Sequence, residues 1–187
     1  MKKLFLTVFL FGFSLLFNAQ VVSVEKSTYG IQTGVLGIYF HNETKLSDQI
    51  ALRSEIGLDS GIFGGTFYRE TGYFFTPVFT LEPRWYYNLE KRLAKQKTIN
   101  GNCGNFFSLK TSYNSNWFVV SNYDNLTVEN QISIVPTWGI KRNINKHFTY
   151  EAGIGIGYRH IFYKDSQFHK NQDEVIPNIH LRIGYRF

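Results

Sequence analysis

The stretch EAGIGIGYRH, residues 151–160, places glycines at positions 153, 155 and 157, with isoleucines between them. A glycine loop that cradles a phosphate group needs the spacing G-x-G-x-x-G, with a strand before it and a helix after it. In this stretch the apolar and small residues alternate without interruption, and no helical pattern follows. The stretch therefore predicts a β-strand whose two faces differ, with the glycines on one face.

His160, at the end of this stretch, could act as a general base. A membrane-embedded lipid deacylase or acyltransferase needs such a base beside a nucleophile, and no serine lies within two positions of His160. The five histidines form neither an H-x-x-H nor an H-E-x-x-H pattern, and Cys103 is the only cysteine. We therefore predict no catalytic residue, no metal ligand, no cofactor and no enzymatic activity.

Two carboxylates lie near arginines in the sequence: Glu82 beside Arg84, and Glu151 ahead of Arg159. Such groups could act as acids or bases, but a confined charge needs a partner of opposite sign. We interpret them as ion pairs that fill a polar interior. The predicted interior charge network consists of Arg53, Glu55, Glu82, Arg84, Lys110, Glu151, Arg159, Arg182 and Arg186.

From about residue 29 onward, apolar and polar residues alternate in segments separated by polar turns. We expect an all-β fold, a single up-and-down antiparallel barrel. Since bacterial single-chain barrels have an even number of strands, we expect eight. The predicted strands are 29–41, 49–60, 73–87, 105–115, 130–142, 147–163 and 174–187, with Val21 to Lys26 as the eighth.

Alternation alone does not tell whether the apolar face looks inward, as in a soluble lipocalin-like barrel, or outward into lipid. Three features favour a transmembrane barrel with a lumen filled by polar side chains. The polar face carries charges of both signs, most of its cations being arginine; the glycines fall on that face; and aromatic residues gather near strand ends. Prolines lie at positions 77, 83, 136 and 177 of the predicted strands. Because a proline cannot donate a backbone hydrogen bond to the neighbouring strand, we expect bulges or strand-end positions there.

The joins between the predicted strands differ in length. Short joins at 41–48 and 143–146 alternate with longer segments around 60–72, 115–128 and 164–174, as expected for periplasmic turns and external loops. The join from Asn88 to Asn105 is long for the periplasmic side. It includes a possible short helical turn at 89–97.

The first 19 residues read as a secretory signal peptide, with Lys2 and Lys3 ahead of an apolar run. The alternative is an uncleaved anchor helix, for which the apolar run is short. Residues 20–187 then form one barrel domain. The formal charge of +6 comes from scattered basic residues, so we expect no nucleic-acid partner.

The C-terminal LRIGYRF, with Tyr185 and Phe187 at alternate positions, resembles the assembly signal of bacterial outer-membrane barrels. The stretches LEPRWYYNLEKR and FTYEAGIGIGYR resemble a family of small outer-membrane proteins of the OmpA-like barrel type. The resemblance spans the mature chain and implies a fold and an outer-membrane location. It implies a monomer whose partners are lipid, lipopolysaccharide and the barrel-assembly machinery. It implies no catalytic residues.

Three functions remain open at this point. A structural or interaction scaffold needs only a rigid barrel and exposed loops, and we expect this function. A narrow solute channel needs an open lumen, whereas about eight strands enclose only enough space for side chains. A lipid-modifying enzyme needs a nucleophile for His160.

Overall fold

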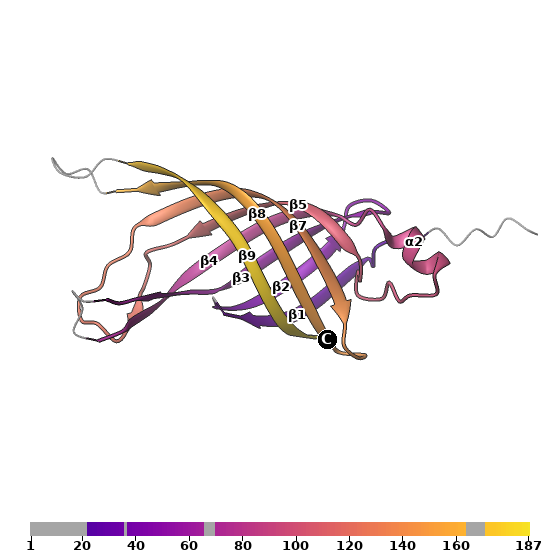
Figure 1. The fold of residues 1–187 in the computed structure, drawn as a ribbon, viewed down its shortest axis with the longest axis horizontal. Coiled ribbons are helices and arrows are strands. Elements are labelled where there is room, and N and C mark those ends of the chain that lie inside the picture. The colour runs from indigo at the N-terminus through magenta and orange to yellow at the C-terminus, as the bar shows by residue number, and fades with distance from the viewer. Residues whose placement is uncertain (1–21, 36, 66–69, 164–170) are drawn as a thin grey trace, which may run out of the picture.

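The computed structural model describes residues 22–35, 37–65, 70–163 and 171–187. The predicted signal peptide lies outside the described residues. Within these described residues, nine strands and one short helix follow one another along the chain (Figure 1). They are β1 (Ser27–Gly34), β2 (Gly37–Lys45), β3 (Ile50–Phe63), β4 (Gly72–Trp85), α2 (Leu89–Ala94), β5 (Asn105–Asn114), β6 (Val120–Ser121), β7 (Asn130–Asn143), β8 (Phe148–Phe162) and β9 (Gln172–Arg186).

Eight of these strands form a closed ring. Each strand pairs antiparallel with its neighbours in the order β1, β2, β3, β4, β5, β7, β8 and β9, and β9 pairs back onto β1. The two-residue strand β6 lies outside the ring order and pairs with β4. The prediction of an all-β antiparallel fold with eight ring strands is therefore confirmed.

The predicted first strand, 29–41, is wrong: it is a hairpin of two strands. The chain reverses between Gly34 and Gly37, which pair with each other, and β2 continues to Lys45. The predicted strand at Val21 to Lys26 is also wrong, because residues 22–26 form no strand. This turn carries none of the polar residues that usually mark a hairpin, so its apolar residues read as one continuing strand.

The prolines interrupt hydrogen bonding without shifting the register. Pairing of β4 with β5 stops at Leu81 and resumes in the same register at Arg84, on either side of Pro83. Pairing of β7 with β8 is interrupted in the same way around Pro136. A proline lacks one donor, so it weakens the ladder on one side only. The expected bulges are absent at all four prolines, and of the four, Pro83 lies near a strand end.

The two ends of the ring differ. At one end, which we call the plug end, lie the turns 46–49 and 144–147 and the long join 86–104 with α2. At the other, the loop end, lie the hairpin turn, the join 115–129 and the strand ends at Phe63, Gly72, Phe162 and Gln172. Figure 1 shows α2 and the start of the described chain together at the plug end.

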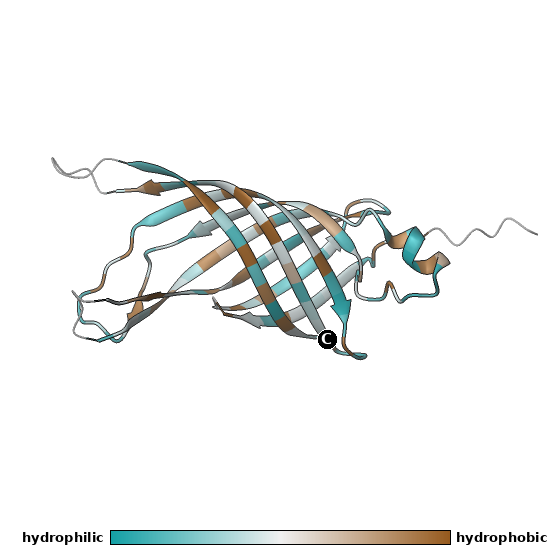
Figure 2. Cartoon of the chain, in the orientation of Figure 1, coloured by the Kyte–Doolittle hydropathy of each residue, from teal (hydrophilic) through white to brown (hydrophobic). Residues whose placement is uncertain are grey.

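The ring is polar inside and apolar outside. Along β3, Ala51, Arg53 and Glu55 are buried, whereas Ile50 and Ile56 are exposed. The same alternation runs along the other strands as bands of contrasting hydropathy (Figure 2). An ordinary soluble protein shows the opposite arrangement, because its apolar residues are the buried ones.

Candidate functional site

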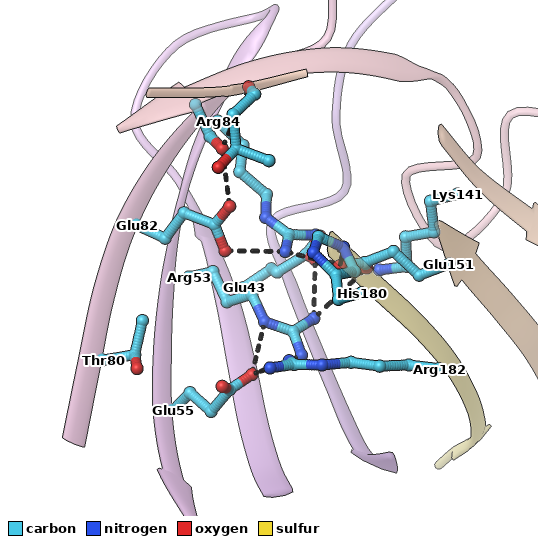
Figure 3. Close-up of polar contacts among 12 residues, drawn as sticks. Glu43, Arg53, Glu55, Thr80, Glu82, Arg84, Lys141, Glu151, His180 and Arg182 are labelled. Atoms are coloured by element: carbon cyan, nitrogen blue, oxygen red, sulfur yellow. Dashed lines mark hydrogen bonds and ion pairs between the residues drawn. The ribbon is translucent and has the colours of Figure 1, made fainter. Parts of the chain in front are cut away.

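The interior holds a cluster of buried charges in the half of the ring nearer the plug. We call it the charge network (Figure 3). Its members come from β2, β3, β4, β7, β8 and β9, and they comprise four cations and four anions, so their formal charges balance. They are Glu43, Arg53, Glu55, Glu82, Arg84, Lys141, Glu151 and Arg182.

Arg84 is the central cation of the network. Both of its terminal nitrogens donate to Glu151 at 2.8 Å, and one also donates to Glu82 at 2.7 Å. Its guanidinium carbon lies 4.3 Å from the centre of the Phe106 ring. Fork-shaped contacts between arginine and carboxylate are among the strongest hydrogen bonds in proteins, so Arg84 ties β4 to β8 across the interior.

Arg53 and Arg182 share the carboxylate of Glu55. Arg53 donates to it at 2.6 and 3.0 Å, and Arg182 donates at 2.8 Å. Arg182 also stacks on the Tyr39 ring at 3.9 Å. A carboxylate without such partners would be costly to bury, so these contacts account for Glu55 inside the ring.

Glu43 links the charge network to residues of the long join at the plug end. One of its oxygens lies 3.0 Å from the ammonium of Lys141 and 3.2 Å from Arg84. The other accepts hydrogen bonds from Asn102 at 2.8 Å and from Tyr86 at 3.1 Å. Sequence reasoning placed Glu43 in a turn and therefore missed it. Lys141 lies in the predicted strand 130–142, but the predicted network did not include it.

The other predicted charges lie apart from this cluster. Arg159 pairs with Glu174 toward the loop end, and Arg186 lies 3.4 Å from Glu25 at the plug end. Lys110 lines a cavity in the half of the ring nearer the loop end. Of the nine residues predicted for the network, the structure brings Arg53, Glu55, Glu82, Arg84, Glu151 and Arg182 together and separates these three.

The plug closes the ring beside the charge network. Its core is a cluster of buried apolar side chains from the N-terminal segment, the long join and the first residues of β3 and β5: Val24, Ala51, Tyr86, Leu89 and Phe106. Cys103, in the same long join, is fully buried. Burial raises the pKa of its thiol. The plug and the network together occupy this end of the interior.

A cavity of about 610 Å³ fills the other half of the ring. Its lining includes Arg182 next to the charge network and Gly34 at the hairpin turn. Asp59 is the carboxylate in its wall, and it accepts hydrogen bonds from Tyr39 at 2.7 Å and from Asn114 at 2.6 Å. Drug-sized ligands occupy pockets of about 300–1,000 Å³, so this cavity is large enough for a small molecule.

The outer surface carries aromatic residues at both ends and aliphatic residues between them. On β8, Phe148 and Tyr150 lie toward the plug end, Ile154 and Ile156 lie in the middle, and Tyr158 begins the aromatic residues near the loop end. From Tyr150 to Tyr158 the strand is nine residues long. Strands that span a bilayer are about 9–11 residues long.

The predicted assembly residues lie on the outer face of β9 and at its end. The Tyr185 ring contacts Phe148 and Phe187 at centroid distances of 5.4 and 5.5 Å. The backbone nitrogen of Phe187 donates to the carbonyl of Tyr29 at 3.1 Å. The C-terminal residue therefore belongs to the seam between the first and last strands.

His160 contacts Asp173 on the neighbouring strand at 2.5 Å. Within the part of the chain that the structure describes, its ring contacts no serine, threonine or cysteine side chain. The same residues contain no cluster of side chains suited to a metal ion. They also form no helix long and apolar enough to cross a membrane.

Comparison with known proteins identifies no relative. No protein-family model, no curated protein and no solved structure matches the chain. A function for this chain must therefore be inferred from its fold and its interior geometry.

Proposed function

We propose that the chain is a transmembrane β-barrel of the bacterial outer membrane, made as a precursor with a signal peptide. The observation that carries this proposal is the inverted polarity of the ring, with charges buried and isoleucines exposed. Lipid would cover the exposed aliphatic residues, and the aromatic residues at both ends fit the two interfaces of a bilayer. Such a barrel needs no soluble partner to cover its outer face.

The barrel is a non-conducting scaffold in this proposal. An ion crossing it would have to pass both the charge network and the plug. Breaking a buried ion pair costs about 3–5 kcal/mol, which makes spontaneous opening rare. Interaction with other molecules would then belong to the loop end, because binding residues are concentrated on loops held by a rigid framework.

Cell fractionation combined with conductance measurement tests this proposal. We expect the mature protein in the outer-membrane fraction, and no steady conductance when it is inserted in planar bilayers. Recovery as a soluble periplasmic protein would refute the membrane location. Steady conductance would refute the closed scaffold and support a channel.

A further inference from the structure

The ring has an opening in its side, above the hairpin of β1 and β2. These are the two shortest ring strands, with 8 and 9 residues. β9 begins at Gln172 but pairs with β1 only from Arg182 onward, and β3 continues past Asp59, where its pairing with β2 ends. Figure 1 shows β9 and β3 extending toward the loop end beyond the hairpin. We call the gap between them the side opening.

Among the described residues, no strand pairs with the edge of β9 at this opening. The backbone nitrogen of Phe187 donates toward β1, and that of Arg186 donates toward the turn before β8. Because direction alternates along a strand, the amides of Val175 and Ile179 also face the β1 side, where no strand pairs with them. Pro177 lies between them and has no amide hydrogen. Proline is typical of strand edges that face something other than another strand.

The cavity reaches the side opening. A strand in a closed wall presents only alternate residues to the interior, but the cavity lining includes every residue of β9 from Ile176 to Arg182. Val35 at the hairpin turn also lines the cavity. Ile179 and Val35 are among the most exposed apolar residues of the chain, at 72% and 78%. The cavity therefore has a polar interior and an apolar border at its side.

Lys110 lies across the ring from this opening. In the ring order, β5 and β7 are the strands opposite β1 and β2. Eight tilted strands at about 4.8 Å spacing give a ring about 16 Å across. Lys110 on β5 lines the cavity, and its ammonium makes no hydrogen bond or ion pair with the described residues.

The nearby carboxylates are already engaged by other donors. Glu55 is held by Arg53 and Arg182, and Asp59 is held by Tyr39 and Asn114. Asp59 carries a formal negative charge in the same cavity wall, but no carboxylate of the described residues lies within ion-pair distance of the Lys110 ammonium. A confined cation that no carboxylate contacts favours an anion beside it.

We propose that this cavity binds a single-chain anionic amphiphile of the fatty-acid class. The carboxylate pairs with Lys110, and the tail leaves through the side opening, where it meets Val35 and Ile179. The binding site for the carboxylate, which we call the acid site, depends only on the cavity. The surroundings of the tail depend on the membrane location proposed above. The cavity and its opening thus match a ligand with one charged end and one apolar end.

Fluorescence titration with dansyl-undecanoic acid tests the acid site, using the full mature protein in amphipol. We expect saturable binding of the acid and much weaker binding of its methyl ester. Lys110→Met should weaken acid binding by about tenfold or more, since a hydrogen bond to a charged group contributes about 1.5–3 kcal/mol. Lys97→Met, at an exposed position in the plug join, is the matched control and should change nothing. Equal affinity for acid and ester, or for the wild type and Lys110→Met, overturns the proposal.

Methyl NMR with a fatty acid that carries a spin label at its tail end tests the side opening. We expect signal broadening at Val35 and Ile179 that disappears in Lys110→Met. Ile134, which is exposed on β7 across the ring, should show no such Lys110-dependent change. Equal broadening at Ile134, or none at Ile179, overturns the route of the tail. A soluble protein that still bound the acid through Lys110 would refute the membrane proposal and support this site.

Discussion

Arg84 and Glu151 meet across the interior of the ring through two hydrogen bonds of 2.8 Å, although they lie 67 residues apart in the chain. Their strands, β4 and β8, are not neighbours in the sheet. The contact therefore joins parts of the wall that backbone pairing does not join. Glu151 also lies 3.7 Å from Arg53, so one carboxylate holds two cations.

Replacing Glu151 with glutamine should destabilise the fold strongly. Glu151→Gln keeps the shape of the side chain and removes its charge, which leaves Arg84 and Arg53 with a net excess of positive charge in a buried site. We expect the free energy of unfolding to fall by about 3 kcal/mol. Urea unfolding of the purified protein, followed by tryptophan fluorescence, measures this change.

Glu174→Gln is the matched control, because Glu174 pairs with Arg159 in a partly exposed position. The side chains of that pair are 28% and 32% exposed. An ion pair that water can screen contributes less than about 1 kcal/mol. If Glu151→Gln lowered the free energy of unfolding as little as Glu174→Gln does, the interior of the ring would be solvated.

Two of the alternating glycines of β8, Gly155 and Gly157, keep space for the neighbouring backbone. A Cβ atom at Gly157 would lie 2.3 Å from the carbonyl oxygen of Ile134 and 2.6 Å from the Cα of Val135. Backbone cannot move aside as a flexible side chain can, so Gly157→Ala should cost about 1–3 kcal/mol. Thermal unfolding of the variant measures this cost.

Gly64→Ala is the control for this substitution. The nearest atoms to a Cβ at Gly64 are those of Thr71, at 3.7 Å, which is ordinary contact. We expect its melting temperature to stay close to that of the wild type. If both variants melted alike, close approach of strands would not explain the glycines.

The alternation of residue types was sufficient to predict most strands and the buried face of each. In the segments 49–60 and 147–163 the period of two residues runs unbroken, and that period is a property of the extended backbone itself. The boundary near Gly34 was missed because the hairpin turn is apolar. That error hid β2, and with it Glu43.

The partners inside the ring could not be predicted in the same way. Alternation shows that Arg84 and Arg159 share the polar face of their strands, but not how far apart they lie along the ring. Strand length and register decide that Arg84 reaches Glu151 while Arg159 pairs with Glu174. The side opening likewise depends on the short β1 and β2, whose ends no local pattern marks.

The thiol of Cys103 should resist alkylation while the plug is folded. The residue is fully buried, and burial raises the pKa of its thiol. Because the thiolate is the reactive form, both effects slow its reaction with iodoacetamide near pH 8. Mass spectrometry of the folded protein should show little modification, and denaturant should make it complete.

Leu89→Ala provides the comparison for that measurement. Leu89 packs with Val24, Tyr86 and Phe106 in the plug core, so its truncation leaves a cavity that costs about 2–5 kcal/mol. We expect Cys103 to react faster in Leu89→Ala, because the plug opens more often. Rapid modification in the wild type would contradict a closed plug.

Removing Phe187 should impair assembly of the ring. Its backbone nitrogen bonds to Tyr29 in β1, and its ring packs against Tyr185, so the deletion weakens the seam where the first and last strands meet. β1 and β9 share only five paired positions, fewer than any other neighbouring pair in the ring. We expect less mature protein in the outer-membrane fraction, measured by immunoblot after fractionation.

Shortening the join between β8 and β9, residues 163–171, by a few residues separates this seam effect from a general loss of stability. That join connects β8 and β9 at the loop end, far along β9 from Phe187. Loop length changes the closure entropy only slowly, so the shortened variant should reach the membrane at nearly the wild-type level. If it were lost as completely as the Phe187 deletion, the C-terminal residue would have no special part in assembly.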